Sequence, residues 1–151
     1  MNKFSLAETI GRDIFNKKLI NNHSSGITFT ENIYDKVDVF WEKYDKKYVG
    51  ELKYRDNYPS SSRCVVEEGV LLEKTKYDEL MKYYELSGLT AYYITIFNDG
   101  VMYLWNIGEL DGIEWKKEEK FPRTTKGSRK EKVAKVVAYL PLDSGHKSKY
   151  S

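Results

Sequence analysis

The chain has 151 residues, of which 40% are hydrophobic and 32% charged, and its formal net charge is +2. This balance is typical of a globular domain and argues against a disordered or membrane-spanning protein, because no apolar run approaches the length of a transmembrane helix. The N-terminus turns acidic before any secretory apolar segment, and one cysteine with two histidines argues against a disulfide or a structural zinc site. We therefore expect an intracellular, cytoplasmic protein.

The first part of the chain predicts one helix followed by strands. Residues 4–21 place their apolar side chains near one helical face, and the turn formers of the following NNHSSG end this amphipathic helix. A short strand is expected at 27–31. Residues 36–55 are dense in valine and aromatic residues, with polar residues clustered near Tyr44–Lys47. They predict two strands joined by a turn, followed by a loop over 56–63.

The next part predicts a second helix and further strands. Residues 64–72 fit either a strand or the start of a helix. The helix is expected over 73–87, where Gly88 stops it, and its apolar stripe consists of Tyr77, Leu80, Met81 and Tyr84. Residues 90–97 are apolar on both faces, which indicates a central buried strand, and the turn Asn98–Gly100 leads into a strand at 101–107.

The last part is basic and less regular. Residues 113–151 hold 11 Lys and Arg against 5 Asp and Glu, which suits a polyanionic partner or an ordinary solvated face. A basic arm is expected over 121–132 and a final strand over 135–142. The order of helices and strands predicts an α/β protein with one domain over residues 1–143 and a flexible tail at 144–151.

The hairpin at 36–55 carries the residues that point to chemistry. Side chains alternate along a strand, so Glu51, Lys53 and Arg55 share one face. A turn centred between Asp45 and Lys46 pairs Asp38 with Lys53 and Phe40 with Glu51, which places Asp38 on the same face. A shift of one residue would move Asp38 to the other face, so the grouping depends on the register.

Two carboxylates and a lysine on one sheet face have two interpretations. They can be a solvated face in which Asp38 and Lys53 form a cross-strand ion pair. They can also be a Mg²⁺ or Mn²⁺ site, because Mg²⁺ takes one or two protein carboxylates, here Asp38 and Glu51, and the Leu52 carbonyl can add a ligand. Such a metal polarises a phosphodiester and acidifies a water, and Lys53 can orient that water or neutralise charge on the phosphate.

The spacing of Asp38 and Glu51-Leu52-Lys53 resembles the D…(D/E)xK motif of the PD-(D/E)XK nuclease superfamily, although Val37 replaces the proline of that motif. The element order over roughly residues 4–107 also resembles this superfamily. The resemblance implies a restriction-endonuclease-like core (αβββαβ), a central mixed β-sheet flanked by helices. It implies a Mg²⁺-dependent endonuclease acting on DNA, in which Asp38 and Glu51 are metal ligands and Lys53 is the catalytic lysine.

The resemblance also implies further site residues. Glu8 on the first helix is the best match for a carboxylate facing the site, and Glu31 is a weaker one. On the second helix Lys74 and Lys76 are expected to contact phosphates, as is Arg55. The composition of the basic arm adds candidate phosphate contacts at Arg123, Lys126 and Arg129.

The resemblance leaves the kind of protein open. Small members of the superfamily include Holliday junction resolvases, restriction enzymes and phage-encoded nucleases, for which the location would be the host cytoplasm. A resolvase would be a homodimer, and the face of strand 101–107 with Val101, Tyr103, Trp105 and Ile107 is either its dimer surface or core. The alternatives to an enzyme are a catalytically inactive nucleic-acid-binding module on the same fold and an unrelated α/β protein.

Overall fold

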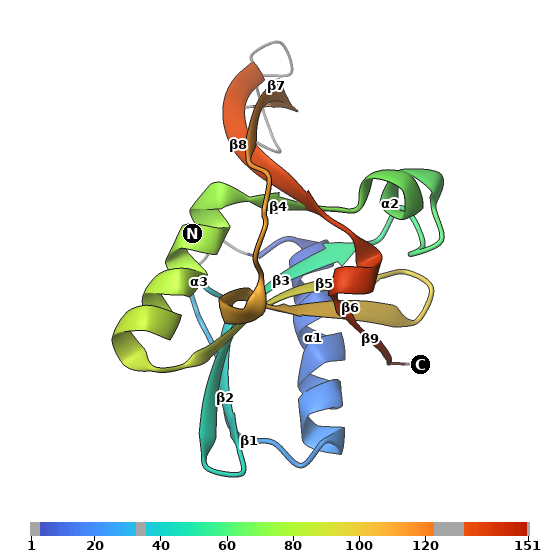
Figure 1. Cartoon of the computed structure of the whole chain (residues 1–151). Coiled ribbons are helices and arrows are strands. Elements are labelled where there is room, and N and C mark those ends of the chain that lie inside the picture. The colour runs from blue at the N-terminus through green and yellow to red at the C-terminus, as the bar shows by residue number, and fades with distance from the viewer. Residues whose placement is uncertain (1–3, 33–35, 123–131, 151) are drawn as a thin grey trace.

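The computed structural model describes residues 4–32, 36–122 and 132–150 (Figure 1). It is a mixed α/β fold in which helices flank a central mixed sheet, as expected. The first elements are α1 (Leu6–Asn21), β1 (Ser25–Phe29), β2 (Val39–Lys43), β3 (Lys46–Arg55), α2 (Arg63–Glu68), β4 (Val70–Glu73) and α3 (Lys74–Ser87). The later elements are β5 (Thr90–Phe97), β6 (Val101–Asn106), β7 (Lys116–Pro122), β8 (Lys132–Leu140) and β9 (His146–Lys149), with 3₁₀ turns at Ile107–Glu109 and Leu142–Ser144.

The main sheet has six strands in the order β1-β2-β3-β5-β6-β9. The β3 and β5 strands are parallel, and every other neighbouring pair is antiparallel. The chain between β3 and β5 must therefore cross over the sheet, and α2, β4 and α3 make that crossing. A second sheet has the order β4-β8-β7 and extends to the top of Figure 1.

Two apolar layers hold the helices to opposite faces of the main sheet. On one face Phe15 and Leu19 of α1 pack with Trp41, Ile94 and Met102. The other face joins Leu80 of α3 to a larger set of buried residues, which includes Val49, Ala91, Tyr93, Phe97 and Trp105. The predicted helices and the central strand over 90–97 are thus confirmed by the packing.

The helix stripe predicted on α3 is correct in part. Leu80 is fully buried, and Tyr77 and Met81 pack against the core. Tyr84 is instead 43% exposed and lies against Gly108, while Tyr83 packs edge to face on Phe40. The apolar contact between α3 and the sheet ends before the last residue of the predicted stripe. The Tyr84 side chain therefore lies at the edge of the core.

Three other regions differ from the sequence-based expectation. Residues 64–72 are expected to be either a strand or the start of a helix, but they contain both, because most of α2 and most of β4 lie within this range. The expected tail is wrong, because residues 146–149 form β9 and pair with β6, which closes the exposed edge of that strand. The face of 101–107 is core and not a dimer surface, since Val101, Tyr103, Trp105 and Ile107 are all buried. None of the described helices has the length and apolar character needed to cross a membrane.

Candidate active site

The β2–β3 hairpin determines where the candidate residues lie. Its two-residue turn, Tyr44–Asp45, has positive φ at both positions (50° and 63°), which matches the twist of the flanking strands. Val39 therefore pairs with Gly50 and Phe40 with Val49. The predicted pairing of Phe40 with Glu51 is wrong, because the turn is centred one residue earlier than predicted. The resulting shift of two residues in pairing leaves the predicted alternation unchanged. Asp38 itself lies before β2, where its backbone N–H donates to the Gly50 carbonyl at 2.9 Å.

Asp38 lies just before β2 and is fixed by contacts to both carboxylate oxygens. Its Oδ1 accepts from Nη2 of Arg12 at 3.0 Å, and its Oδ2 accepts from the backbone N–H of Leu52 at 2.7 Å. Arg12 in turn donates to Thr30 and lies over the Phe4 ring. Charge-assisted hydrogen bonds from two elements fix the rotamer of this carboxylate and hold it at the end of the hairpin.

Glu51 is a carboxylate inside the protein. It is 5% exposed, and its Oε1 lies 3.1 Å from Nζ of Lys76 on α3. Burial first, and then the charge of Asp38, raise the pKa of Glu51 to about 7, although Lys76 and Lys53 oppose the shift. Burial lowers the pKa of Lys76, but the charge of Glu51 outweighs it, and the net pKa is raised. Glu51 is thus a desolvated carboxylate whose pKa responds to the charges of Asp38, Lys76 and Lys53.

Lys53 stands two residues along the same face from Glu51. Its charge lowers the pKa of both Glu51 and Glu73, so it acts on both carboxylates. Glu73 forms an ion pair of 2.7 Å with Lys135 of β8; burial raises the pKa of Glu73, but this pairing outweighs it. Within the part of the chain that the structure describes, Lys53 has no carboxylate at ion-pair distance, and it is only partly exposed. It is the lysine of this cluster that a substrate could engage.

The other predicted site residues divide into two groups. Lys76 joins the cluster through Glu51. Arg55 has a buried Nε for which the described residues provide no hydrogen-bond partner. Lys74 instead pairs with Asp78 at 2.9 Å and lies over the Trp115 ring, so its ammonium group is turned along the surface of α3. Arg123, Lys126 and Arg129 lie outside the described residues.

The structure does not place Glu8 beside Asp38 and Glu51. It is exposed, and its Oε1 accepts from the N–H of Ser5 while Ser5 Oγ accepts from the N–H of Glu8. This capping box satisfies free backbone groups at the start of α1, which gives Glu8 a role at the helix end. Glu31, the weaker candidate, is also exposed. Among the described residues no group of three or more His, Cys, Asp or Glu side chains could hold a metal.

The donor set nevertheless suits a hard divalent cation. Asp38 and Glu51 supply carboxylate oxygens, and Mg²⁺ commonly binds through only one or two carboxylates while it keeps several waters. Glu51 already has a cation at 3.1 Å, the Lys76 ammonium, and a bound metal would compete with it. Both Asp38 oxygens retain further lone pairs beyond their present hydrogen bonds. The fit is therefore to a partly hydrated Mg²⁺ or Mn²⁺ and not to a fully protein-enclosed ion.

Several members of this charged cluster were not predicted from the sequence. Arg12, Glu73 and Lys135 come from α1, the end of β4 and β8, which are distant from the hairpin in the chain. No local spacing connects them to the motif. The position of Arg12 between Ile10 and Ile14 of an amphipathic helix indicates that its side chain can lie near the sheet. This position does not identify Asp38 as its partner.

Comparison with known proteins agrees with this architecture. No family model matches the chain, and no curated protein matches its sequence. Among solved structures it resembles Hjc, a Holliday junction resolvase from the archaeal hyperthermophile Archaeoglobus fulgidus. The TM-score is 0.52 over 91% of this chain and 93% of the resolvase chain, at 12% sequence identity. The chain thus has the fold of a resolvase nuclease, which is the fold class that the sequence predicted.

Proposed function

We propose that this protein is a metal-dependent nuclease that hydrolyses phosphodiester bonds in DNA. The observation that supports the proposal is that Asp38, just before β2, and Lys53 of β3 both act by charge on the buried Glu51 of β3, in a sheet with the fold of a resolvase. We further propose that branched DNA, such as a four-way junction, is the substrate and that a homodimer cuts it, because two strands must be cut symmetrically.

Each residue of the cluster has a definable role in this reaction. Asp38 and Glu51, with the Leu52 carbonyl, would hold Mg²⁺ or Mn²⁺, which when bound polarises the phosphodiester and acidifies a water. The Arg12 hydrogen bond keeps one Asp38 oxygen in place. Lys53 orients the attacking water or neutralises charge that develops on the phosphate. Lys76 is paired with Glu51 in this structure, and its ammonium group would be available to a phosphate oxygen if Glu51 held a metal.

DNA contacts are proposed on the same side. Arg55 shares the strand face with Lys53, and the guanidinium group of this partly exposed residue is proposed to donate to a phosphate oxygen. Lys74 and the basic residues Arg123, Lys126 and Arg129 are proposed to follow the phosphate backbone. Each substitution that removes one of these phosphate contacts should reduce the salt slope of duplex binding by about 0.9.

A second candidate function is a catalytically inactive nucleic-acid-binding module. It is favoured by the ion pairs Arg12–Asp38 and Lys76–Glu51, which satisfy both carboxylates without any metal. In that case the cluster would be structural, and removal of either carboxylate would leave its buried partner uncompensated.

A panel of single-stranded, duplex, flap and four-way junction DNA, each with Mg²⁺, Mn²⁺ or a chelator, separates these functions. We expect metal-dependent cleavage that Asp38→Asn and Glu51→Gln abolish while the fold and DNA binding persist. Lys53→Ala should also lose cleavage but keep metal binding, since a cation is not a ligand. Glu67→Gln is the matched control, because that carboxylate is 59% exposed on α2. Full cleavage by Asp38→Asn would refute the assignment, and DNA binding without cleavage by the natural sequence would favour the module.

A further inference from the structure

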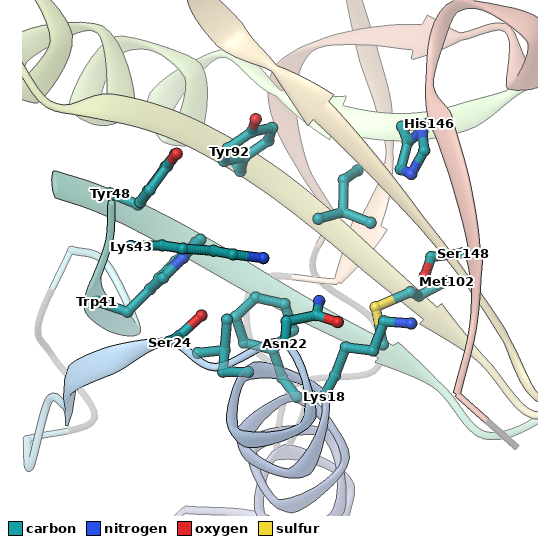
Figure 2. Close-up of a pocket in the computed structure, with 13 residues that line it drawn as sticks. Lys18, Asn22, Ser24, Trp41, Lys43, Tyr48, Tyr92, Met102, His146 and Ser148 are labelled. Atoms are coloured by element: carbon teal, nitrogen blue, oxygen red, sulfur yellow. The ribbon is translucent and has the colours of Figure 1, made fainter. Parts of the chain in front are cut away.

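A pocket lies on the α1 face of the main sheet (Figure 2), whereas Glu51 and its partner Lys76 lie on the α3 face. Its volume is about 190 Å³. Phe15 and Leu19 of α1, with Trp41, Met102 and Leu104 of the sheet, supply its apolar surface. The end of α1, the β2–β3 hairpin and β9 surround it, so it collects residues from the first, middle and last parts of the chain.

Aromatic rings form one wall of this pocket. Trp41 stacks on Tyr48 at 5.3 Å with an interplanar angle of 10°, and Tyr92 lies 6.3 Å from Trp41 and 6.0 Å from Tyr48 at angles of 24° and 30°. Phe15 supports Trp41 from below in an edge-to-face contact at 5.3 Å. Trp41 is only 6% exposed, so the ring surface available to a ligand belongs mainly to the partly exposed Tyr48 and Tyr92, against which another planar aromatic group can stack.

The polar part of the pocket is cationic. Lys18, Lys43 and His146 are among the 13 lining residues, and none of those 13 is an Asp or a Glu. Lys18 donates to the Lys149 carbonyl at 2.9 Å, which holds its ammonium group beside β9. Figure 2 shows the Lys43 side chain extended across the opening between Trp41 and the two tyrosines. A ligand that neutralises these charges must be an anion, and one that uses the rings must also be planar and aromatic.

Strand alternation separates this pocket from the candidate active site. Trp41 and Tyr48 point to the α1 face, whereas Phe40, Val49 and Glu51 point to the α3 face. The two regions share the hairpin but no lining residue. A ligand in the pocket therefore does not need the metal site, and the inference below is independent of the proposed function.

We infer that this pocket binds one nucleotide unit, with its base against Trp41, Tyr48 and Tyr92 and its phosphate beside Lys43 and His146. Aromatic rings can bind the base, while the Lys43 ammonium group and a ring N–H of His146 can donate to the phosphate. The volume admits a single base and is too small for a base pair with its two backbones. The unit is either a free mononucleotide or an unpaired nucleotide of a single strand, and the same contacts serve both.

The test follows the three indole N–H signals by NMR in the full chain, with a chelator present to keep the metal site out of the reaction. Trp41 lines the pocket, whereas Trp105 is buried on the other face and Trp115 packs on Tyr77. Titration with thymidine monophosphate should shift the Trp41 signal alone. Thymidine and inorganic phosphate should each bind at least about fivefold more weakly than the nucleotide, because each lacks one of the two contacts.

Variants and a second ligand complete the experiment. Lys43→Gln and His146→Gln should weaken nucleotide binding at least about fivefold with an unchanged melting temperature, since both side chains lie at the rim. Lys47→Gln, an exposed lysine of the same hairpin outside the pocket, is the matched control. Tighter binding of an oligothymidylate than of the mononucleotide would assign the pocket to a strand, and the reverse order to a free nucleotide. A Trp41 signal that does not move, that moves equally with phosphate alone, or that is unaffected by Lys43→Gln would overturn the inference.

Discussion

The two faces of the β2–β3 hairpin differ in how they hold their functional side chains. In the charged cluster Asp38 is held by Arg12 of α1, and Glu51, on the α3 face, is held by Lys76 of α3. On the α1 face Trp41, Tyr48 and Tyr92 are held by ring stacking within the sheet itself. One strand thus contributes to a charged site and to an aromatic pocket, because consecutive residues point in opposite directions.

This difference means that the two faces should respond to different perturbations. The stability that a charged cluster contributes changes with pH, with bound metal and with removal of one ion-pair partner, because it depends on which carboxyl groups are protonated. An aromatic layer responds to volume, because packed interiors tolerate neither a cavity nor an added methyl group. Perturbing one face at a time shows whether they are independent.

The largest effect on stability is expected from the packing that holds the helices to the two faces. Leu80→Ala should lower the free energy of unfolding by roughly 2–5 kcal/mol, because Leu80 is fully buried under α3. Leu86→Ala in the same helix makes the same chemical change at a side chain that is 82% exposed, and should stay within about 0.5 kcal/mol. Urea unfolding of the two variants gives the comparison. Equal losses would show that the helix face is assigned incorrectly.

The next effect concerns pH and the charged face. The folded protein raises the pKa of Glu51 from its ordinary 4.5 to about 7, mainly by burial. Between these values the folded state keeps a proton that the unfolded state releases. The metal-free protein should therefore lose stability as pH rises from about 4.5 to about 7, by on the order of 3 kcal/mol in all.

Glu51→Gln should remove this dependence and make the metal-free protein more stable than the natural sequence above pH 7. The amide carries no charge to desolvate, and Lys76 is 28% exposed, so its ammonium group can reach water. Chemical unfolding at several pH values, with a chelator, measures the two profiles, and Glu67→Gln serves as the exposed control. If the free energy of unfolding changes with pH in the same way in Glu51→Gln and in the natural sequence, Glu51 is ionised in the folded protein, as in a structural ion pair.

Gly50→Ala tests the boundary between the faces. A Cβ at Gly50 would lie 2.9 Å from Ile94 Cδ1 and 3.2 Å from Trp41 Cζ3, so it would enter the aromatic face next to Glu51. We expect a loss of roughly 1–3 kcal/mol and a shifted Trp41 indole signal, while the pH profile due to Glu51 stays unchanged. Lys47→Ala, exposed on the same strand, should be near neutral. A changed pH profile would show that the faces are coupled through the strand.

The fold could be predicted from the sequence where one periodicity dominates a segment. The helix over 73–87, the strand over 90–97 and the hairpin carry their own patterns, and all are confirmed. The strand β9 could not be predicted from HKSK, because an edge strand with exposed polar side chains is defined by its hydrogen bonds to β6 and not by apolar residues.

The candidate site could be predicted only as far as the hairpin extends. Parity puts Glu51 and Lys53 on one face in either register, because an even shift leaves faces unchanged, whereas the place of Asp38 in the site stays a prediction. Arg12 and Lys135 depend on how α1 and β8 pack, which no local pattern encodes. The aromatic pocket was missed for the same reason: Trp41, Tyr92 and His146 come together only when β2, β5 and β9 are placed around α1.

The smallest expected effect decides whether Glu8 belongs to the charged face. The sequence predicts a site carboxylate, whereas the structure places Glu8 in a capping box with Ser5. Ser5→Ala should cost about 1 kcal/mol, because it removes the acceptor for the Glu8 N–H. Glu8→Gln keeps a side-chain oxygen for the Ser5 N–H, so we expect a change of only a few tenths of a kcal/mol.

The distinguishing measurement is cleavage by the Glu8 variants beside their thermal melts. If Glu8 only caps α1, Glu8→Gln and Glu8→Ala both keep the metal-dependent activity, and Glu8→Ala alone melts slightly lower. A carboxylate that helps to hold the metal behaves in the opposite way: Glu8→Gln would lose cleavage with an unchanged melting temperature, since the cap survives and the charge does not. We expect the first pattern, because the Glu8 carboxylate is exposed and already accepts the Ser5 N–H at 3.0 Å.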